Sequence, residues 1–329
     1  MWSGRAHRDG EIEETVDVSI AETGEFGLIA RIVARLETGA ASVLGPGDDA
    51  AIVAAPDRRV VASTDVLVEG RHFRRDWASA ADIGHRAAAA NLADIAAMGA
   101  TPTALLVALC VPTNLEPEWV EELAGGISAE AGLVGAGVVG GDMSSSPTLT
   151  IAVTALGDLE GRDPVLRGGA QPGDVVALCG RTGHAAAGYT VLSRGFRTPK
   201  LLVEAYRRPE VPYAAGPAAA RLGATSMIDV SDGLLQDLGH VAVAGVVGID
   251  IERAAFEVPG QMRDAASALG VDPYVWLLAG GDDHALAATF PPGVPLPPDW
   301  RAVGSVHEGT GVTVDRRPWQ GGTGWDHFR

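Results

Sequence analysis

The feature that most constrains this chain is a repeated pattern in which a short apolar run ends in a glycine-rich turn that carries an aspartate. The plainest example is Gly140-Gly141-Asp142, which follows the apolar residues 134–139. Two glycines allow a tight turn and a close approach of the backbone to a ligand. A carboxylate at the mouth of a strand suits a hard cation that carries phosphates. The pattern therefore predicts strands that deliver carboxylates to a phosphate-binding site.

Apolar periodicity between these turns predicts strands and helices that alternate along the chain. Helices are expected from residue 25 to Gly39, at residues 78–98, 116–131, 184–192 and 272–278, and from Ser231 onward. Strands are expected at residues 52–53, 60–65, 104–111, 137–141, 148–157, 175–179, 226–229, 248–251, 285–290, 300–306 and 312–314. This order indicates an α/β fold with mixed α+β character.

The length of 329 residues is enough for two domains. Residues 1–23 are polar and acidic and lack apolar periodicity, which predicts a flexible N-terminal extension. The composition becomes loop-like around residues 159–167, so we place a domain boundary there. We expect a sheet-forming N-terminal domain at residues 24–160 and a C-terminal α/β domain at residues 161–329.

The formal net charge of −17 argues against a nucleic-acid partner, because binding to a phosphate backbone needs a basic face. A nucleotide ligand remains compatible with this charge if metal ions lie between protein carboxylates and substrate phosphates. The first residues resemble no signal peptide, and every apolar stretch is interrupted before it could span a membrane. Cys110 and Cys179 lie in apolar runs without metal-ligand spacing, and we expect both to be reduced core thiols. These observations predict a cytoplasmic protein without a membrane partner.

Carboxylates stand at six places where a strand ends or a helix face is apolar. These places are Asp48/Asp49, Asp65, Asp94, Asp142, Asp229/Asp232 and Asp282/Asp283. Each one alone is as readily explained by an aspartate that forms a turn or caps a helix. Six together, with almost no lysine to pair them, favour several Mg²⁺ ions, since crowded carboxylates repel each other unless cations hold them.

Asp94 is the most informative of these carboxylates. It shares a helix face with Asn91, three residues earlier, and its neighbours are apolar on nearly every side. A buried charge needs a partner, and a metal ion is the simplest one. The alternative is a long-range salt bridge, for which the nearest candidate is Arg86, two turns back.

Four further residues allow both a functional and an ordinary structural interpretation. Ser231 precedes a predicted helix, so it can cap that helix or lie beside a phosphate at its N-terminus. Arg167 lies in a glycine-rich loop and is a candidate phosphate contact or a solvated surface residue. His72 and Trp325 are ordinary surface or core residues unless outside information selects them.

The motifs, taken in order, resemble the thiamine-monophosphate kinase family, which belongs to the aminoimidazole ribonucleotide synthetase-like superfamily. They comprise Gly47-Asp48-Asp49, Ser63-Thr64-Asp65, Gly70-Arg71-His72-Phe73, residues 91–100, Gly140-Gly141-Asp142, residues 167–174, residues 229–234 and residues 280–284. The Gly-x-His-Phe motif and the ending Gly-Trp-x-His-Phe at residues 324–328 narrow the resemblance from the superfamily to this family. The resemblance covers nearly the whole chain.

This resemblance implies a homodimer that pairs through the sheets of its N-terminal domains, with ATP near the interface. It implies ATP-dependent phosphorylation of thiamine monophosphate to thiamine diphosphate with several Mg²⁺ ions. The implied metal ligands are Asp49, Thr64, Asp65, Asp94, Asp142, Asp229 and Asp232. The implied ATP contacts are Gly141, Asp142, Arg167 and Ser231, and the implied contacts to thiamine monophosphate are His72, Asp282 and Trp325.

Two departures from the family pattern concern the substrate side. Gly280-Gly281-Asp282-Asp283-His284 stands where the family has Gly-Gly-Glu-Asp-Tyr, so one carboxylate is a methylene shorter. His184 stands in a glycine turn where the family has aspartate.

Two alternatives stay open at this point. One is another ATP-dependent enzyme of the superfamily, such as an aminoimidazole ribonucleotide synthetase-like or hydrogenase-maturation-like enzyme. A selenophosphate-forming member would need an early Cys or Lys, whereas the first cysteine is Cys110 and the one lysine is Lys200. The other alternative is a non-catalytic, acidic, metal-binding protein, which would have no need for Arg167 or His72.

Overall fold

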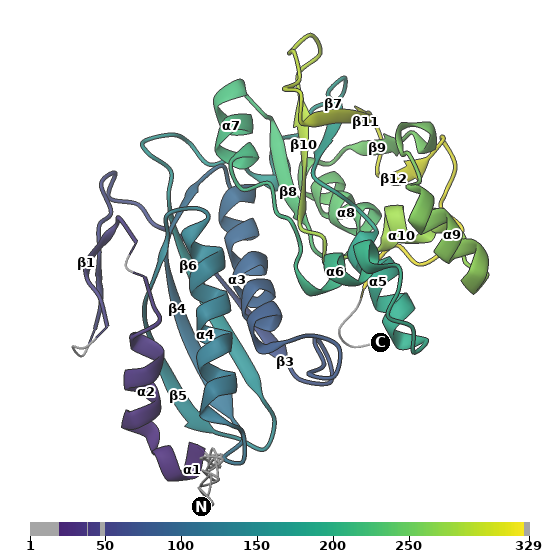
Figure 1. Ribbon diagram of the computed structural model, residues 1–329. Coiled ribbons are helices and arrows are strands. Elements are labelled where there is room, and N and C mark those ends of the chain that lie inside the picture. Colours follow the sequence, from purple (N-terminus) through teal and green to yellow (C-terminus); the bar gives the residue numbers. More distant parts are fainter. Residues whose placement is uncertain (1–19, 38, 47–49, 326–329) are drawn as a thin grey trace, which may run out of the picture.

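The computed structural model describes residues 20–37, 39–46 and 50–325, and it contains two main sheets with helices packed on them (Figure 1). The first half comprises α1 Ile20–Thr23, α2 Glu25–Val33, β1 Ser42–Leu44, β2 Ile52–Val53, β3 Val61–Val68, α3 Ala80–Ala97, β4 Thr101–Val111, α4 Pro117–Gly132, β5 Gly137–Ser145 and β6 Thr150–Asp158. The second half comprises the 3-10 turn η1 Arg167–Gly169, β7 Val175–Cys179, α5 His184–Ser193, α6 Lys200–Arg207, α7 Ala215–Leu222, β8 Ser226–Val230, α8 Leu234–Gly245, β9 Gly248–Ile251, the 3-10 turn η2 Arg253–Ala255, α9 Gly260–Leu269, α10 Pro273–Ala279, β10 Ala285–Phe290, β11 Trp300–His307 and β12 Gly311–Val314. The predicted mixed α/β class is confirmed.

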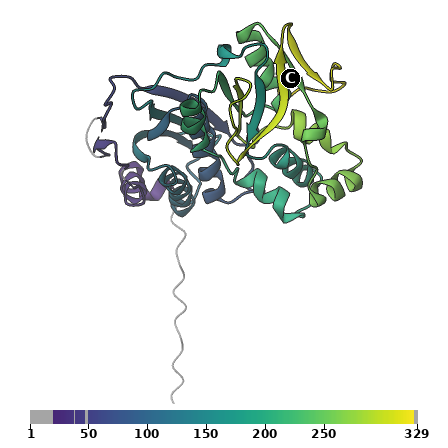
Figure 2. The same cartoon turned by 90° about the horizontal axis from the view of Figure 1, so that it is seen from above.

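The first sheet has the strand order β3-β6-β4-β5, in which only β4 and β5 are parallel. Helices α3 and α4 cover one face of it, whereas none of the described helices covers the opposite face, which we call the uncovered face (Figure 2). Strand β6 alternates strictly between buried and half-buried residues, as a strand with one packed face should. On the uncovered face, Val66 and Leu106 remain 49% and 38% exposed.

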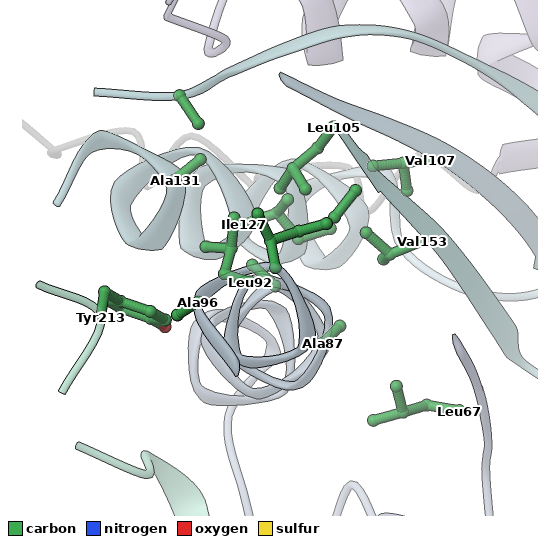
Figure 3. Close-up of a cluster of buried hydrophobic side chains, with 14 of the residues drawn as sticks. Leu67, Ala87, Leu92, Ala96, Leu105, Val107, Ile127, Ala131, Val153 and Tyr213 are labelled. Atoms are coloured by element: carbon green, nitrogen blue, oxygen red, sulfur yellow. The ribbon is translucent and has the colours of Figure 1, made fainter. Parts of the chain in front are cut away.

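Helix α3 lies at the centre of the molecule because its alanines and glycine allow close packing on several sides. Its N-terminus carries a capping box in which the Ser79 side chain accepts from the Asp82 amide and the Asp82 carboxylate accepts from the Ser79 amide. A Cβ atom on Gly84 would lie only 2.2 Å from the Leu123 carbonyl oxygen of α4, so glycine is required at this crossing. Leu92 and Ile127 then pack between the helices and the sheet (Figure 3).

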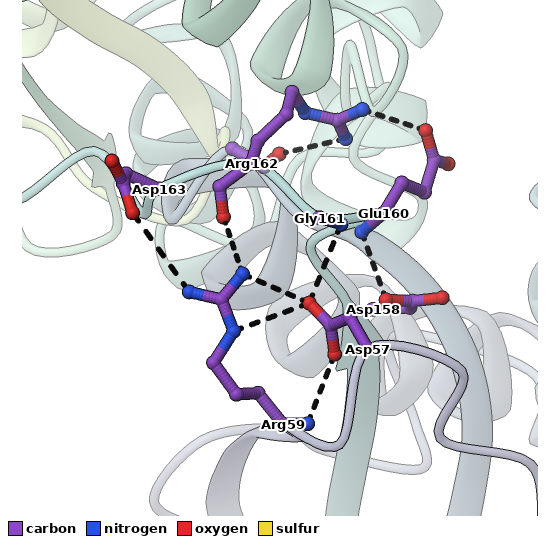
Figure 4. Close-up of polar contacts among 8 residues, drawn as sticks. Asp57, Arg59, Asp158, Glu160, Gly161, Arg162 and Asp163 are labelled. Carbon is purple, nitrogen blue, oxygen red and sulfur yellow. Dashed lines mark hydrogen bonds and ion pairs between the residues drawn. The ribbon is translucent and has the colours of Figure 1, made fainter.

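The second sheet has the order β12-β9-β11-β7-β10-β8 and is antiparallel except for the pair β12 and β9. Its residues Leu286 and Phe290 share one buried cluster with Ile95 of α3, so the apolar core continues from one half of the chain to the other. The division of the chain at residue 160 stays a prediction. The polypeptide there is held in place, since Arg59 donates to the carbonyl oxygen of Arg162 at 2.8 Å and the Glu160 amide donates to Asp158 at 2.8 Å (Figure 4).

Several predicted elements differ from the observed ones. The structure places Ile20–Thr23 in helix α1 with Ile20 buried, so these four residues of the predicted extension belong to the folded part, and residues 1–19 lie outside the described residues. The helix that starts at residue 25 ends at Val33 rather than continuing to Gly39. Helices α6, α7 and α9 were not predicted, because they lie in proline-containing stretches that resemble loops. Pro199 and Pro259 in fact precede the first residues of α6 and α9, where proline does not break a helix.

The largest correction concerns Gly140-Gly141-Asp142, which is not a turn. These residues lie inside β5 and continue its pairing with β4, next to a bulge between Leu105 and Leu106. A Cβ on Gly141 would lie 2.0 Å from the Val107 carbonyl oxygen, so this glycine is needed for strand pairing. Among the described residues, no helix combines the length and the apolar character needed to cross a membrane.

Candidate functional site at the junction of the two sheets

Helix α3 presents Asp94 to the place where strand β3 of the first sheet and strand β8 of the second come together. The Ser63 hydroxyl of β3 donates to Asp94 Oδ2 at 2.5 Å. Three residues earlier on α3, the Asn91 side chain accepts from the Asp65 amide at 3.0 Å and donates to the Ala87 carbonyl at 2.9 Å. The helix thereby fixes the edge strand β3 and holds Asp65 beside Asp94, as the shared face of Asn91 and Asp94 predicts.

Asp94 is a buried carboxylate with other negative charges close to it. Burial raises its pKa to about 7, and the negative charges of Asp229 and Asp65 act in the same direction. The hydrogen bond from Ser63 and the nearby His284 oppose this rise. Asp229 comes from β8, so the two halves of the chain bring their carboxylates to one point.

Arg86 does not neutralise Asp94, so the salt bridge that the sequence allowed for Asp94 is not made. The Arg86 guanidinium pairs with Asp282, with 2.7 Å between Nη2 and Oδ2. The eight residues from Arg86 to Asp94 span about 12 Å of helix. The metal-ligand role of Asp94 stays a prediction.

Asp229 and His284 form the second-sheet side of this junction. Their Oδ2 and Nδ1 atoms are 3.1 Å apart and both side chains are buried. Burial opposes the charged form of His284, but the bond to Asp229 and the charges of Asp229, Asp282 and Asp94 raise its pKa overall. A histidine that carries a proton here partly compensates the carboxylates.

The turn after β8 has a different helix cap from the predicted one. Helix α8 starts at Leu234 rather than at Ser231, with Gly233 as its N-cap. The Asp237 carboxylate accepts from the amides of Asp232 and Gly233 at 3.1 and 3.0 Å, so it takes the capping role considered for Ser231 and Asp232. Burial, with a smaller contribution from Asp229, raises the pKa of Asp237 to about 7.

The loop at residues 280–284 lies directly against this turn. The Asp282 amide donates to the Ser231 carbonyl at 2.8 Å, and a Cβ on Gly281 would lie 2.1 Å from the same carbonyl oxygen. Trp325 also reaches the turn, since its amide donates to the Asp232 carbonyl at 3.0 Å while the residue stays 46% exposed. Ser231, Asp232, Asp282 and Trp325 are therefore neighbours, although almost a hundred residues separate the first from the last.

His72 follows strand β3, where its Nδ1 accepts from the Val68 amide at 2.9 Å. It lies in the segment that connects β3 to the start of α3, at the end of that helix nearer to Arg86 than to Asp94. A contact between His72 and the acceptor substrate stays a prediction.

The structure does not bring all the predicted residues together. Asp142 is exposed on β5, and its cross-strand partners Ala108, Ala152 and Val66 belong to the uncovered face of the first sheet. Asp65 belongs to the row of Val153 and Val107, which faces the helices. Strands β3 and β5 are the two edges of the sheet, so about 14 Å separates them at the usual strand spacing. Within one chain, Asp142 and Gly141 lie away from Asp94.

Arg167 and Thr64 are also placed differently from the other candidates. Arg167 lies in η1, which packs beside Thr225 before β8 and Ala244 near the end of α8. It is thus at the opposite end of both elements from Ser231, and α8 alone is about 18 Å long. The Thr64 hydroxyl donates to the Val153 carbonyl at 3.0 Å and accepts from Thr154 on the uncovered face. Ser63, which sequence reasoning missed, is the hydroxyl that reaches Asp94.

Asp49 lies outside the described residues. Within residues 20–37, 39–46 and 50–325, no three His, Cys, Asp or Glu side chains are close enough to form a metal site by themselves. The carboxylates at the junction still suit a hard cation, because they offer oxygen ligands. They also repel one another, and this repulsion together with burial raises the pKa of Asp94 to about 7.

Comparisons with known proteins identify relatives of this chain. Residues 47–159 match the family model described as AIR synthase related protein, N-terminal domain. A thiamine-monophosphate kinase of Mycobacterium tuberculosis is 46% identical over 316 residues, which are 95% of this chain and 94% of that protein. The solved structure of AaThiL complexed with AMPPCP and TMP is similar with a TM-score of 0.77 and 31% identity, covering 93% of this chain and 98% of that one.

The hydrogenase maturation protein HypE of E. coli has the same fold, with a TM-score of 0.69 over 87% of this chain and 92% of that one. Its identity to this chain is only 19%, so this similarity concerns the fold alone.

Proposed function

This chain belongs to the thiamine-monophosphate kinase family, and we propose that it transfers the γ-phosphate of ATP directly to thiamine monophosphate with the assistance of Mg²⁺. The observation that carries this proposal is Asp94, a buried carboxylate that faces Asp229 and Asp65 while the nearest arginine of its helix is paired elsewhere. The complex of the related AaThiL with AMPPCP and TMP supports ATP and thiamine monophosphate as the two substrates.

Asp65, Asp94 and Asp229 would hold Mg²⁺ at the junction, and Asp232 lies in the adjoining turn. When bound, such ions neutralise the phosphate oxygens between which the phosphoryl group passes. Ser63 and Asn91 orient the carboxylates, since the first donates to Asp94 and the second holds the backbone of Asp65. Asp49, outside the described residues, remains a further candidate ligand.

The reaction needs no nucleophile from the protein, because a phosphate oxygen of thiamine monophosphate can attack the γ-phosphorus in line. The task of this chain is to bring two anions together in the correct orientation. Ser231 lies between the carboxylates and the loop that carries Asp282, which suits a contact to the nucleotide. We assign His72, Asp282 and Trp325 to the acceptor side, because they lie around the same junction.

We also propose a homodimer that pairs through the uncovered face of the first sheet. This face carries solvent-exposed apolar residues, among them Val66 and Leu106, which a second copy would cover. Asp142 lies on the same face, so a second copy that packs on this face with its β5 near the free edge of β3 would bring Asp142 and the backbone of Gly141 towards the junction. This arrangement gives the exposed Asp142 a role as a ligand of the nucleotide-bound metal ion. Arg167 would also require a second copy, or a long nucleotide, to reach the site.

Because the reaction consumes ATP, we propose a cytoplasmic location.

The acceptor distinguishes this function from the two alternatives. ADP release would be measured with ATP and Mg²⁺ and with one acceptor at a time, namely thiamine monophosphate, thiamine or formylglycinamidine ribonucleotide. We expect release with thiamine monophosphate only. Release with the ribonucleotide would favour another enzyme of the superfamily, and Mg²⁺ binding without release in any mixture would favour a non-catalytic protein.

A further inference from the structure

One buried arginine connects helix α3 to the loop at residues 280–284 on the other half of the chain. Arg86 is only 6% exposed, and its Nη2 lies 2.7 Å from Asp282 Oδ2. The Asp282 side chain is itself 47% exposed, so this carboxylate faces the solvent side of the junction while its partner is buried. Buried Arg86 therefore holds the accessible carboxylate of Asp282 in place from the protein interior.

The Arg86 side chain is held from several directions. Its Nη1 donates to the Tyr206 carbonyl at 3.1 Å, and its guanidinium lies over the Tyr206 ring at 4.5 Å. Trp77 contacts the same ring edge-on, with 6.0 Å between ring centroids. A guanidinium held by a ring, a carbonyl and the helix has little freedom, which suits a group that positions another residue.

The loop that Arg86 holds has a backbone that needs support. Asp282 and His284 both have positive φ angles, 69° and 50°, which residues other than glycine seldom adopt. The loop also carries His284, which bonds to Asp229. Helix α3 therefore contacts the loop through Arg86 at Asp282, and about two turns further along the same helix Asp94 lies near His284 of the loop and near Asp229 of β8.

We propose that Arg86 is a positioning residue for the acceptor substrate: it holds the Asp282 carboxylate at a fixed place relative to the Asp94 end of the same helix. About 12 Å of rigid helix then sets the spacing between the acceptor contact and the carboxylates of the phosphoryl-transfer site. This inference rests on the proposed kinase function. It predicts that loss of Arg86 weakens the use of thiamine monophosphate and leaves the use of ATP nearly unchanged.

Steady-state kinetics of the full chain with both substrates varied would test this. Arg86→Met keeps much of the apolar stem and removes the charge. We expect KM for thiamine monophosphate to rise about tenfold, which corresponds to about 1.4 kcal/mol, while KM for ATP changes less than about twofold. Arg86→Lys should recover part of the loss, because it restores a positive charge without the forked geometry.

Arg208→Met is the matched control. Arg208 pairs with Asp82 of the same helix and also joins α3 to the second half of the chain, but this pair is one turn further from the junction. We expect this variant to keep both KM values. If Arg208→Met raises KM for thiamine monophosphate as much as Arg86→Met does, the effect is a general loosening between the halves and the proposal is wrong.

A double-mutant cycle with Asp282→Asn keeps the test decisive if Arg86→Met folds poorly. Asp282 is half exposed, so its amide variant should fold, and it should raise KM for thiamine monophosphate by itself. Adding Arg86→Lys to Asp282→Asn should then cause little further change, since the two residues act as one unit. Fully additive effects would overturn the proposal. An inactive wild-type protein would contradict the kinase function itself, whereas an active wild type with unchanged KM in the Arg86 variants would contradict this inference alone.

Discussion

Asp94 and Asp142 are both aspartates within apolar surroundings in the sequence, yet the fold gives them opposite environments. Asp94 is buried at the junction of the two sheets, where burial and the charge of Asp229 raise its pKa to about 7. Asp142 is exposed on the uncovered face of the first sheet, on the edge strand farthest from β3. The comparison shows that two carboxylates predicted for one site can belong to a junction inside one chain, as Asp94 does, or to a surface that a second chain would complete, as we propose for Asp142.

Within strands β3 and β5, the two-residue alternation decides which of the two surfaces a side chain faces. Ser63 and Asp65 point to the side of α3, whereas Thr64 and Val66 point to the uncovered face. The same alternation separates Gly141 from Asp142 on β5. A run of neighbouring polar residues thus serves two different surfaces, and each surface can be tested separately.

The largest expected effect is that of Asp94→Asn. The substitution keeps the shape of the side chain and removes the charge, so turnover should fall roughly 10³-fold or more while the protein stays folded. Initial rates of ADP release at saturating Mg²⁺ and a circular dichroism spectrum would check both parts. Near-normal turnover in this variant would contradict the role of the junction carboxylates.

A mixing experiment tests whether Asp142 acts across two copies. Asp94→Asn and Asp142→Asn proteins, each nearly inactive, would be unfolded together, refolded as an equal mixture and assayed. If each site takes Asp94 from one copy and Asp142 from the other, half of the dimers are mixed and each has one intact site. Activity should therefore return to about a quarter of the wild-type value, given a two-fold symmetric dimer.

The pair Asp94→Asn and Asp229→Asn is the matched control for the mixing experiment. These two carboxylates interact within one chain, so every site in the mixed dimer lacks one of them. We expect no recovery from this mixture. Two results would contradict the distinction between the junction and the uncovered face. One is recovery of activity in the mixture of Asp94→Asn and Asp229→Asn, and the other is no recovery in the mixture of Asp94→Asn and Asp142→Asn.

The smallest effect concerns thermal stability without metal. Asp94 has a pKa of about 7 in the folded chain and an ordinary value near 4 when unfolded. Its contribution to stability is thus fully present below pH 4 and is lost as the pH rises through 7. Between pH 4 and pH 7.5 the Tm of Asp94→Asn should rise relative to wild type, by at least about 2 °C. Mg²⁺ should reduce this difference at pH 7.5.

Asp142→Asn is the comparison variant for the stability measurement. Its carboxylate is exposed in the single chain, so its Tm should follow that of the wild type at every pH. If the difference in Tm between Asp94→Asn and wild type does not change with pH, the charge of Asp94 is not what destabilises the metal-free protein.

Much of the fold could be predicted from periodicity, and the reasons for the failures are specific. Strands β7, β9 and β10 follow the predicted ranges because they are short, mostly apolar runs that polar residues, glycine or proline interrupt. The prediction was wrong at Gly140-Gly141-Asp142, where glycine permits close strand pairing rather than a turn. Local sequence does not distinguish these two uses of glycine, since the difference lies in the neighbouring strand.

The candidate site was predictable in its residue types but not in its pairings. The burial of Asp94 and its shared face with Asn91 follow from helical spacing. The capping role of Asp237 could have been recognised from its position in the first turn of α8, had the start of that helix been placed correctly. The pairing of Arg86 with Asp282 joins positions nearly two hundred residues apart, and no local pattern carries that information.

The most direct test of the whole account is to follow the γ-phosphate itself. Purified wild-type protein would be incubated with Mg²⁺, thiamine monophosphate and ATP labelled in the γ-phosphate, and the products would be separated. The account predicts that label appears in thiamine diphosphate in equal amount to the ADP formed, and that removing Mg²⁺ with a chelator stops both. Label found only in inorganic phosphate, with no labelled thiamine diphosphate, would contradict it.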